Sequence, residues 1–193
     1  RFEYTEQVNA LYVTAKIPAK KWNFQLGLRA EQTRSEGELT ALNSTNNDLV
    51  KRDYIDYFPS AGLSYQLSPV NSFGLNYSRR LDRPSYQNLN PFETKLDELS
   101  FYKGNPFLRP QYTHSLKLTN TLFYRFTTSL SFSYTNDLMT RISDADGEYS
   151  SSLTWLNLNE QYNYNLAFSA PVSITKWWSS YTNASVFHLQ NKA

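Results

Sequence analysis

Three arginines and one aspartate stand close together where an alternating stretch of the sequence ends: Arg79, Arg80, Asp82 and Arg83. Guanidinium groups bind carboxylates and phosphates through paired hydrogen bonds, so these side chains could attract the anionic groups of a ligand. They could equally pair with acidic side chains of the protein and brace neighbouring strands. We favour the bracing role, and we keep Arg79, Arg80 and Arg83 as candidate ligand-binding residues.

A second group of candidate binding residues lies in the stretch 84–109, where the alternating pattern is absent. The group consists of five aromatic residues: Tyr86, Phe92, Phe101, Tyr102 and Phe107. Aromatic rings offer flat surfaces on which ligand groups can stack. The same rings could instead fold this stretch back over the rest of the protein.

No arrangement of residues in the sequence is typical of catalysis or of metal binding. His114 and His188 are isolated from other metal-ligating residues. The stretch from Asp144 to Glu148 begins like a calcium loop, but the distal bidentate carboxylate is not at the required spacing, and we interpret it as a hairpin tip. No set of nucleophile, base and orienting residue occurs, nor a recognisable carboxylate pair. The sequence therefore predicts no enzyme, no catalytic residues, no metal site and no cofactor.

Composition narrows the class of protein. The 193 residues contain no cysteine, so disulfides and thiolate metal sites are excluded. A net charge of +2 is too small for a nucleic-acid-binding surface. No run of about 18 apolar residues exists, which excludes a transmembrane helix, whereas a membrane-spanning β-barrel needs only about 10 residues per strand with every second one apolar. A mean hydropathy of -0.59 is therefore compatible with a membrane protein.

The candidate binding residues must be positioned by strands, because period-two alternation runs through most of the chain. It is clearest at 22–31, 61–68, 73–78, 112–122, 129–135 and 156–168, and Val8, Ala10, Tyr12 and Thr14 share one face of an earlier stretch. About eight antiparallel up-and-down strands are predicted. Turns near 18, 69, 124 and 173 are short. Pro18 is expected to end the first strand, and the turn near 173 is expected to begin at Pro171. Longer connections near 42, 97 and 146 alternate with them, so all short turns fall on one side of the sheet.

Three features indicate that the apolar face meets lipid. The predicted strands have about 12–18 residues, against about 5–6 in globular proteins. The polar face is built from Ser, Thr, Asn and Gln with few charges, as suits a hydrated lumen. Aromatic residues make up 16% of the chain and gather near strand ends, where barrels carry aromatic girdles. The aromatic residues near strand ends are Trp22, Tyr57, Phe58, Tyr112, Tyr124, Trp155, Trp177 and Trp178, and we assign them to the girdles, except that only one of Trp177 and Trp178 can face the apolar side and the other is expected to be a turn residue. The alternative is a soluble, tyrosine-rich β-sandwich that binds a ligand.

Three segments carry a resemblance to a known family. Gly104–Gln111 (GNPFLRPQ) resembles the GNPxLKPE-type segment of TonB-dependent outer-membrane receptors, where it closes an extracellular loop and opens the next strand. Tyr57–Tyr65 (YFPSAGLSY) and Tyr77–Tyr86 (YSRRLDRPSY) look like the outer-membrane β-barrel family abundant in Bacteroidetes. The resemblance is strongest over 54–118.

The resemblance implies a transport function in the outer membrane of a Gram-negative bacterium. Such receptors close about 22 strands around an N-terminal plug and import a siderophore, glycan or peptide, using energy relayed by TonB. We find no plug domain and no TonB box, so we expect 1–193 to be an internal part of a larger barrel. Expected partners are outer-membrane lipid, the TonB complex through the missing N-terminal region, and a surface lipoprotein. The alternative within the membrane is a stand-alone barrel of about eight strands.

Overall fold

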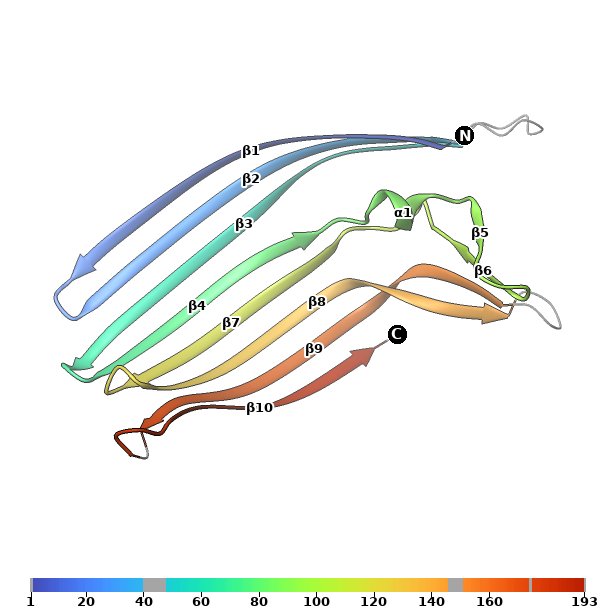
Figure 1. Ribbon diagram of the computed structural model, residues 1–193. Helices are drawn as coiled ribbons and strands as arrows, with labels where there is room; N and C mark the ends of the chain where they lie inside the picture. Colours follow the sequence, from blue (N-terminus) through green and yellow to red (C-terminus); the bar gives the residue numbers. More distant parts are fainter. Residues whose placement is uncertain (1, 40–47, 146–150, 174, 193) are drawn as a thin grey trace.

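The computed structural model describes residues 2–39, 48–145, 151–173 and 175–192, and it confirms the predicted all-β, up-and-down architecture. Eight long strands form an antiparallel meander in the order β1-β2-β3-β4-β7-β8-β9-β10. Their bounds are β1 (Phe2–Ala19), β2 (Trp22–Leu39), β3 (Asp48–Ser68), β4 (Asn71–Asp82), β7 (Gln111–Leu122), β8 (Phe126–Ala145), β9 (Ser151–Ser173) and β10 (Ser179–Lys192). All of them belong to one curved sheet (Figure 1), which contradicts the β-sandwich alternative because a sandwich requires two packed sheets. Among the described residues, no helix has the length and apolar character needed to cross a membrane.

Short turns lie at one end of the sheet and long connections at the other, as predicted (Figure 1). Lys20 and Lys21 join β1 to β2, and Pro69 and Val70 join β3 to β4. Lys20 adopts a left-handed conformation with φ 53°, which allows the tight reversal. The connection 40–47 and the greater part of the expected hairpin tip at 144–148 lie outside the described residues.

Two prolines were wrongly expected to end strands. β1 continues through Pro18, which faces Asn23 of β2, and β9 continues through Pro171, which faces Tyr181 of β10. A proline lacks one backbone donor, and a strand tolerates it where that donor has no partner. Both prolines lie where their strand pairs on one side only within the described residues, because β8 pairs with β9 no further than Ser169.

The strand register separates an apolar from a polar face. Phe24, Leu26 and Leu28 of β2 lie opposite Leu63, Ala61 and Pro59 of β3 on the apolar face. Leu26 is 53% exposed there, as expected of a side chain that meets lipid rather than a protein core. Val8, Ala10 and Tyr12 face Thr33, Glu31 and Arg29, so this alternating set belongs to the polar face. The apolar face of β1 is carried by Leu11, Val13, Ala15 and Ile17, all on the opposite parity.

The apolar face has the height of a membrane. On β2 this apolar band runs over nine residues, from Trp22 to Ala30, and a tilted β-strand spans a membrane with about 9–11 residues. Beyond this band, on the side of the long connections, the same face carries ion pairs. Arg34 lies 3.1 Å from Asp53, and Lys51 lies 3.0 Å from Glu36. Strands β2 and β3 therefore extend past the membrane on that side.

The structure contradicts the girdle assignment of two of the strand-end aromatic residues. Trp22 stacks on Tyr65 at 4.2 Å between ring centroids, at the end of the short turns, and Trp177 and Trp178 lie in the turn before β10. Phe58 lies opposite Arg29 on the polar face, and Trp155 packs against a buried cluster on that face, so their assignment to the girdles was wrong. Strand-end position alone did not reveal the face of either residue.

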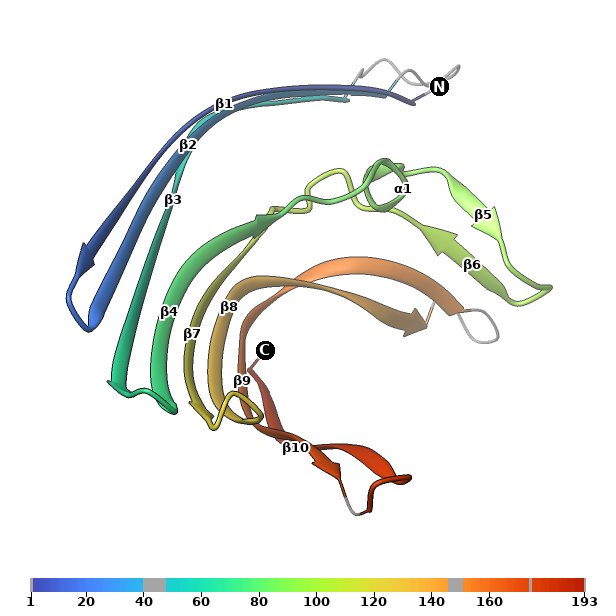
Figure 2. The ribbon, with the colours of Figure 1, turned by 60° about the vertical axis from the view of Figure 1, so that its left-hand side comes forward.

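The stretch 84–109 contains more regular structure than its prolines suggested. A one-turn helix α1 (Tyr86–Leu89) is followed by a short hairpin of β5 (Glu93–Lys95) and β6 (Ser100–Lys103), and β6 pairs in parallel with the start of β9. Pro84, Pro91, Pro106 and Pro110 all lie outside helix and strand, so the prolines limit the length of these elements without preventing them. Figure 2 shows α1, β5 and β6 between the ends of β1–β3 and those of β8–β9.

Candidate functional site

The candidate site begins where β3 and β4 separate. β3 pairs with β2 from Asp48 to Tyr65, but it pairs with β4 only from Ser60 towards the short turn. Ser60 is paired with Ser78 of β4, and from Arg79 to Asp82 β4 pairs with β7 alone among the described residues. The strands β1–β3 consequently diverge from the rest of the sheet at the end of the long connections (Figure 1).

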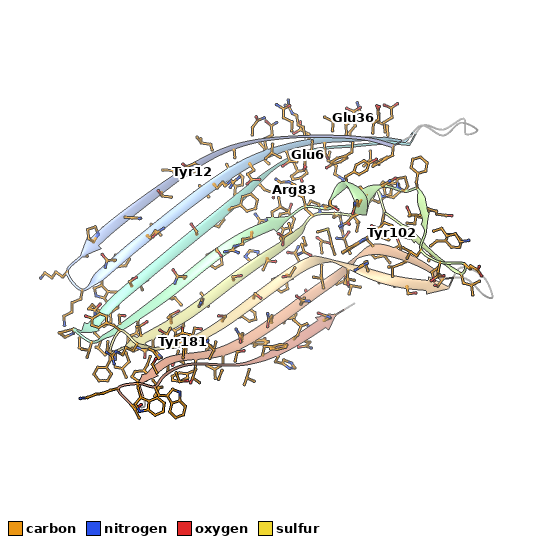
Figure 3. The ribbon with its side chains drawn as sticks, in the orientation of Figure 1. Glu6, Tyr12, Glu36, Arg83, Tyr102 and Tyr181 are labelled. Carbon is orange, nitrogen blue, oxygen red and sulfur yellow. The ribbon has the colours of Figure 1, made fainter. Side chains whose placement is uncertain are left out.

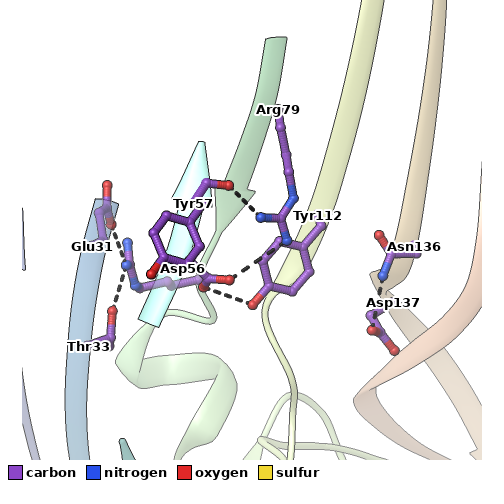
Figure 4. A network of polar contacts seen from close by, with 9 residues as sticks. Glu31, Thr33, Asp56, Tyr57, Arg79, Tyr112, Asn136 and Asp137 are labelled. Carbon is purple, nitrogen blue, oxygen red and sulfur yellow. Dashed lines mark hydrogen bonds and ion pairs between the residues drawn. The ribbon is translucent and has the colours of Figure 1, made fainter. Parts of the chain in front are cut away.

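Arg79 of β4 bridges this separation. Its Nη1 donates to the carbonyl oxygen of Tyr57 at 2.6 Å, and its Nη2 lies 3.7 Å from Asp56 Oδ1. The guanidinium also lies over the ring of Tyr112, 4.6 Å from its centroid, and the Tyr112 hydroxyl donates to Asp56 Oδ2 at 2.9 Å. Figure 4 shows these contacts joining β3, β4 and β7. Side chains thus replace the backbone ladder between β3 and β4.

Pro59 supplies a physical reason for the separation. The Tyr57 carbonyl points towards β4, because it accepts from Arg79. Residues two apart on a strand direct their backbone groups to the same side, so the nitrogen of Pro59 also faces β4. That nitrogen has no hydrogen to donate, and the ladder stops at the next residue, Ser60.

Residues 83–110, which connect β4 to β7, are called the 83–110 segment. Arg83 joins the start of this segment to β1 and β2. Its Nη2 donates to Glu31 Oε2 at 2.6 Å and to Thr33 Oγ1 at 2.8 Å, and its Nε lies 3.4 Å from Glu6 Oε1. Glu31 is 6% exposed and Thr33 is 1% exposed, so these contacts are shielded from water. Arg29 Nε also lies 2.6 Å from Glu31 Oε1. Figure 3 shows Arg83 and Glu6 together beneath the strands β1–β3.

A cavity of about 260 Å³ lies among these groups on the polar face. Its lining residues come from β2, β3 and β4 and from the residue that follows β4: Arg29, Glu31, Phe58, Arg79, Arg80, Leu81, Asp82 and Arg83. Within the part of the chain that the structure describes, Arg80 has neither a hydrogen bond nor an ion pair, and it is exposed. The structure therefore brings the three predicted arginines together but gives them different surroundings. Arg79 and Arg83 have the acidic partners that bracing requires, whereas binding of a ligand by any of the three stays a prediction.

The five predicted aromatic residues also divide into two groups. The Tyr86 hydroxyl donates to the Phe2 carbonyl at 3.2 Å, while the Tyr102 hydroxyl donates to the Gln87 carbonyl and accepts from Trp155 Nε1 at 3.1 Å. These two tyrosines hold the segment in place. Phe92 and Phe107 are exposed and Phe101 is half-buried, so stacking against a ligand stays a prediction for these three.

The motif Gly104–Gln111 anchors the segment. The Gly104 N–H donates to the Asn90 carbonyl at 2.9 Å, and a Cβ at this position would lie 2.4–2.8 Å from three carbonyl oxygens at the end of α1. Asn105 Oδ1 accepts from the Phe107 N–H, and its Nδ2 donates to the Trp155 carbonyl at 3.1 Å. Leu108 is completely buried with Leu89 and Phe2, beside Met139 and Trp155. Glycine at 104 and leucine at 108 are thus required by close packing.

Arg109 joins the end of the segment to β8 and β9. Asn157 of β9 accepts from the Arg109 N–H and donates to its carbonyl, both at 2.9 Å, so one side-chain amide pairs with this backbone as a neighbouring strand would. Arg109 Nη2 lies 2.5 Å from Asp137 of β8. From β3, Arg52 Nη2 donates to the Pro106 carbonyl at 3.0 Å. The segment is therefore fixed to β1–β3 on one side and to β8–β9 on the other.

Sequence reasoning missed the partners of the arginines. Glu31 and Asp56 are acidic residues on the polar side of alternating stretches, and such carboxylates could have been matched with the arginines as candidate partners. Asn157 gave no comparable signal, since many asparagines share its stretch. His114, in turn, contacts the Tyr77 hydroxyl through Nδ1 at 2.9 Å, outside the site.

Solved receptors and transporters have a similar fold. The copper transporter OprC gives a TM-score of 0.71 at 14% identity, over 97% of this chain and 29% of its own. The siderophore receptor PiuA from Acinetobacter baumannii gives 0.64 at 15%, over 98% of this chain and 26% of its own. The FrpB iron transporter from Neisseria meningitidis gives 0.62 at 11%, over 99% and 27%. At these identities the similarity shows the fold alone, and the chain spans less than a third of each of these three proteins.

The family assignment rests on a comparison of a different kind. No curated protein matches the chain in sequence. The outer membrane protein beta-barrel family, however, matches residues 1–193. The alternating strands, the lipid-facing band and the folded 83–110 segment agree with this match, and the chain belongs to the outer membrane protein β-barrel family of the Gram-negative outer membrane.

Proposed function

We propose that this chain forms wall strands and an extracellular loop of a TonB-dependent receptor that imports a nutrient, a siderophore, glycan or peptide, into the periplasm. The observation that carries the proposal is the 83–110 segment. It lies at the end of the long connections, beyond the apolar band, and folds around Leu89 and Leu108 across the polar face. A loop that is built in this way can present Phe92 and Phe107 to a ligand at the entrance of the lumen.

The similar solved structures support import as the activity. Their names describe a siderophore receptor, a copper transporter and an iron transporter. In the proposed receptor, a plug and a TonB-binding region belong to parts of the protein beyond residues 1–193. The motifs at Tyr57–Tyr65 and Tyr77–Tyr86 favour the subset abundant in Bacteroidetes, with a surface lipoprotein as a partner. We propose no enzymatic activity.

A larger barrel explains the sheet better than a stand-alone barrel does. A closed eight-stranded barrel requires its first and last strands to pair. In the described residues, β1 and β10 lie at opposite edges of the sheet, and each pairs with one neighbour, β2 or β9. Further strands between these edges would complete the wall.

Deletion of residues 88–104 from the intact receptor tests the role of the segment. The Asn105 N–H donates to the Asn88 carbonyl at 2.6 Å, so the two ends of the deleted stretch lie close together. We expect growth on the nutrient that requires the receptor to be lost, while heat-modifiable migration on gels shows an inserted barrel. Growth at the rate of the unmodified receptor would show that the segment has no part in capture.

A further inference from the structure

The cavity beside Arg80 has the properties of a site for one anionic group. It is lined by four guanidinium groups and two carboxylates. Glu31 is engaged on both oxygens, by Arg29 and by Arg83, and Asp82 accepts from Gln111 Nε2 at 3.1 Å. Arg79 is held by Asp56 and by the Tyr57 carbonyl. Arg80 is the guanidinium of the lining that has no protein partner among the described residues.

The position of Arg80 directs it to the lumen. Arg80 pairs in register with Thr113 of β7, and Thr113 pairs with Thr135 of β8 on the polar face, where their hydroxyl groups lie 2.8 Å apart. Phe58 lines the same cavity on that face and provides an apolar wall beside the charge. A lipid headgroup is therefore not the occupant, because lipid meets the opposite face.

We propose that Arg80, with Arg29 and the ring of Phe58, binds a carboxylate or phosphate group of the imported nutrient at the separation of β3 and β4. A cavity of about 260 Å³ fits one such group with its nearest atoms and not a whole nutrient. Five donors on a planar guanidinium match either oxyanion through two parallel hydrogen bonds. The inference rests on the proposed function in one respect, that the anionic group belongs to an imported nutrient. The anion site itself can be tested without transport.

Chemical modification of the full-length receptor in detergent tests the site without knowledge of the nutrient. Phenylglyoxal reacts with guanidinium groups, and peptide mass spectrometry gives a separate rate for each arginine. We expect Arg80 to react at least about fivefold faster than Arg79 and Arg83, because those two donate charge-assisted hydrogen bonds. Citrate or pyrophosphate at about 10 mM should slow the modification of Arg80 about tenfold if the anion binds with a Kd of about 1 mM. Maltose, which is neutral, should have no effect.

Matched controls give each outcome a meaning. Arg125, exposed in the turn between β7 and β8, should keep its rate in either anion. Protection by citrate alone identifies a carboxylate, and protection by pyrophosphate alone identifies a phosphate. The proposal is overturned if Arg80 is unreactive without anion, since it would then be paired elsewhere in the receptor. It is also overturned if neither anion protects Arg80, or if Arg125 is protected equally.

Transport variants separate this inference from the proposed function. In cells, Arg80→Gln should lower uptake of an anionic nutrient at limiting concentration about tenfold through a higher KM, and Arg80→Lys should restore part of it. Uptake that is intact in Arg80→Gln, together with absent anion protection, would refute the anion site and leave import standing. Anion protection in a receptor that imports nothing would retain the site and refute import.

Discussion

The carbonyl oxygen of Tyr57 and the guanidinium of Arg79 lie 2.6 Å apart, across the point at which β3 and β4 stop pairing. An arginine side chain here takes the place of a backbone donor, two residues from a proline that cannot supply one. The same guanidinium faces Asp56, which is buried and also accepts from Tyr112. This relationship makes Arg79 a structural residue of the wall.

Replacement of Arg79 should destabilise the barrel. Arg79→Gln removes the cation beside Asp56 and leaves a buried carboxylate with the Tyr112 hydroxyl. We expect the free energy of unfolding of the full receptor in phospholipid vesicles to fall by about 1–3 kcal/mol. Urea titration followed by tryptophan fluorescence measures this change. Arg125→Gln, in an exposed turn, should change it by less than about 0.5 kcal/mol, and equal losses in the two variants would contradict the assigned role of Arg79.

Arg83 and Glu31 should show energetic coupling. Their side chains are 23% and 8% exposed and lie 2.6 Å apart. Either Arg83→Gln or Glu31→Gln alone leaves a charge in a site shielded from water, whereas the double variant leaves none from this pair. We expect the cost of the double variant to be smaller than the sum of the single costs by about 1 kcal/mol or more.

The same urea titrations of the four proteins give the coupling. Arg34 and Asp53 form a matched control pair, since their charged groups lie 3.1 Å apart and both side chains are exposed. Their cycle should give a coupling below about 0.5 kcal/mol. Additive costs for Arg83 and Glu31 would mean that Arg29 alone satisfies Glu31.

The strands and their faces were predictable from sequence because each depends on neighbouring residues. Phe24, Leu26 and Leu28 show the alternation directly, and the short turns follow from where it stops. The contact between Arg83 and Glu31 joins residues 52 positions apart, and the contact between Asn157 and Arg109 joins residues 48 apart. No local pattern records which residues meet at such separations. The orientation of Phe58 and Trp155 was missed for a related reason, because it is decided by strand register and by packing against the loop.

The effect of prolines on the strands differs from the sequence-based expectation in both directions. Pro18 and Pro171 were expected to end strands, yet each occupies a position where its missing donor has no partner. Pro59 lies just before the clear alternating stretch 61–68 and drew no expectation, yet it accounts for the separation of β3 and β4. The effect of a proline on a sheet depends on which side its nitrogen faces, and that is known only once the neighbouring strand is placed.

Leu108 should control the order of the 83–110 segment without controlling insertion of the barrel. Leu108→Ala removes a completely buried side chain from the cluster with Phe2 and Leu89, a change that costs about 2–5 kcal/mol in well-packed cores. We expect limited proteolysis of the full receptor in membranes to cut within 84–110 at least about tenfold faster, because local opening becomes more frequent.

The neighbouring residue offers a control for this experiment. Phe107→Ala removes an aromatic side chain that is 68% exposed and should leave the cleavage rate within about twofold of the unmodified receptor. Heat-modifiable migration should be unchanged in both variants. A segment of Leu108→Ala as resistant as that of the unmodified receptor would show that the hydrogen bonds of Asn105, Arg109 and Asn157 suffice to hold it.

The tip of the β5–β6 hairpin should loosen in acid. Asp97 Oδ1 accepts from the Leu99 N–H at 2.9 Å, and this hydrogen bond is the main cause that lowers the pKa of Asp97 from its ordinary value of 3.8. A lowered pKa means that the ionised form stabilises the fold. The contribution is therefore fully present above the unfolded pKa and is lost as pH falls through the lower, folded pKa. We expect the Leu99 amide to be protected from hydrogen exchange at pH 5–7 and to lose protection below about pH 4, after correction for intrinsic exchange rates.

An amide at position 97 isolates the contribution of charge. Asp97→Asn retains a side-chain oxygen that can accept from the Leu99 N–H but has no proton to gain in this range. Protection of Leu99 in this variant should be weaker than in the unmodified receptor at pH 7, because the acceptor is no longer charged, and it should vary little down to pH 3. If protection in Asp97→Asn fell with pH as steeply as in the unmodified receptor, a different titrating group would control the tip.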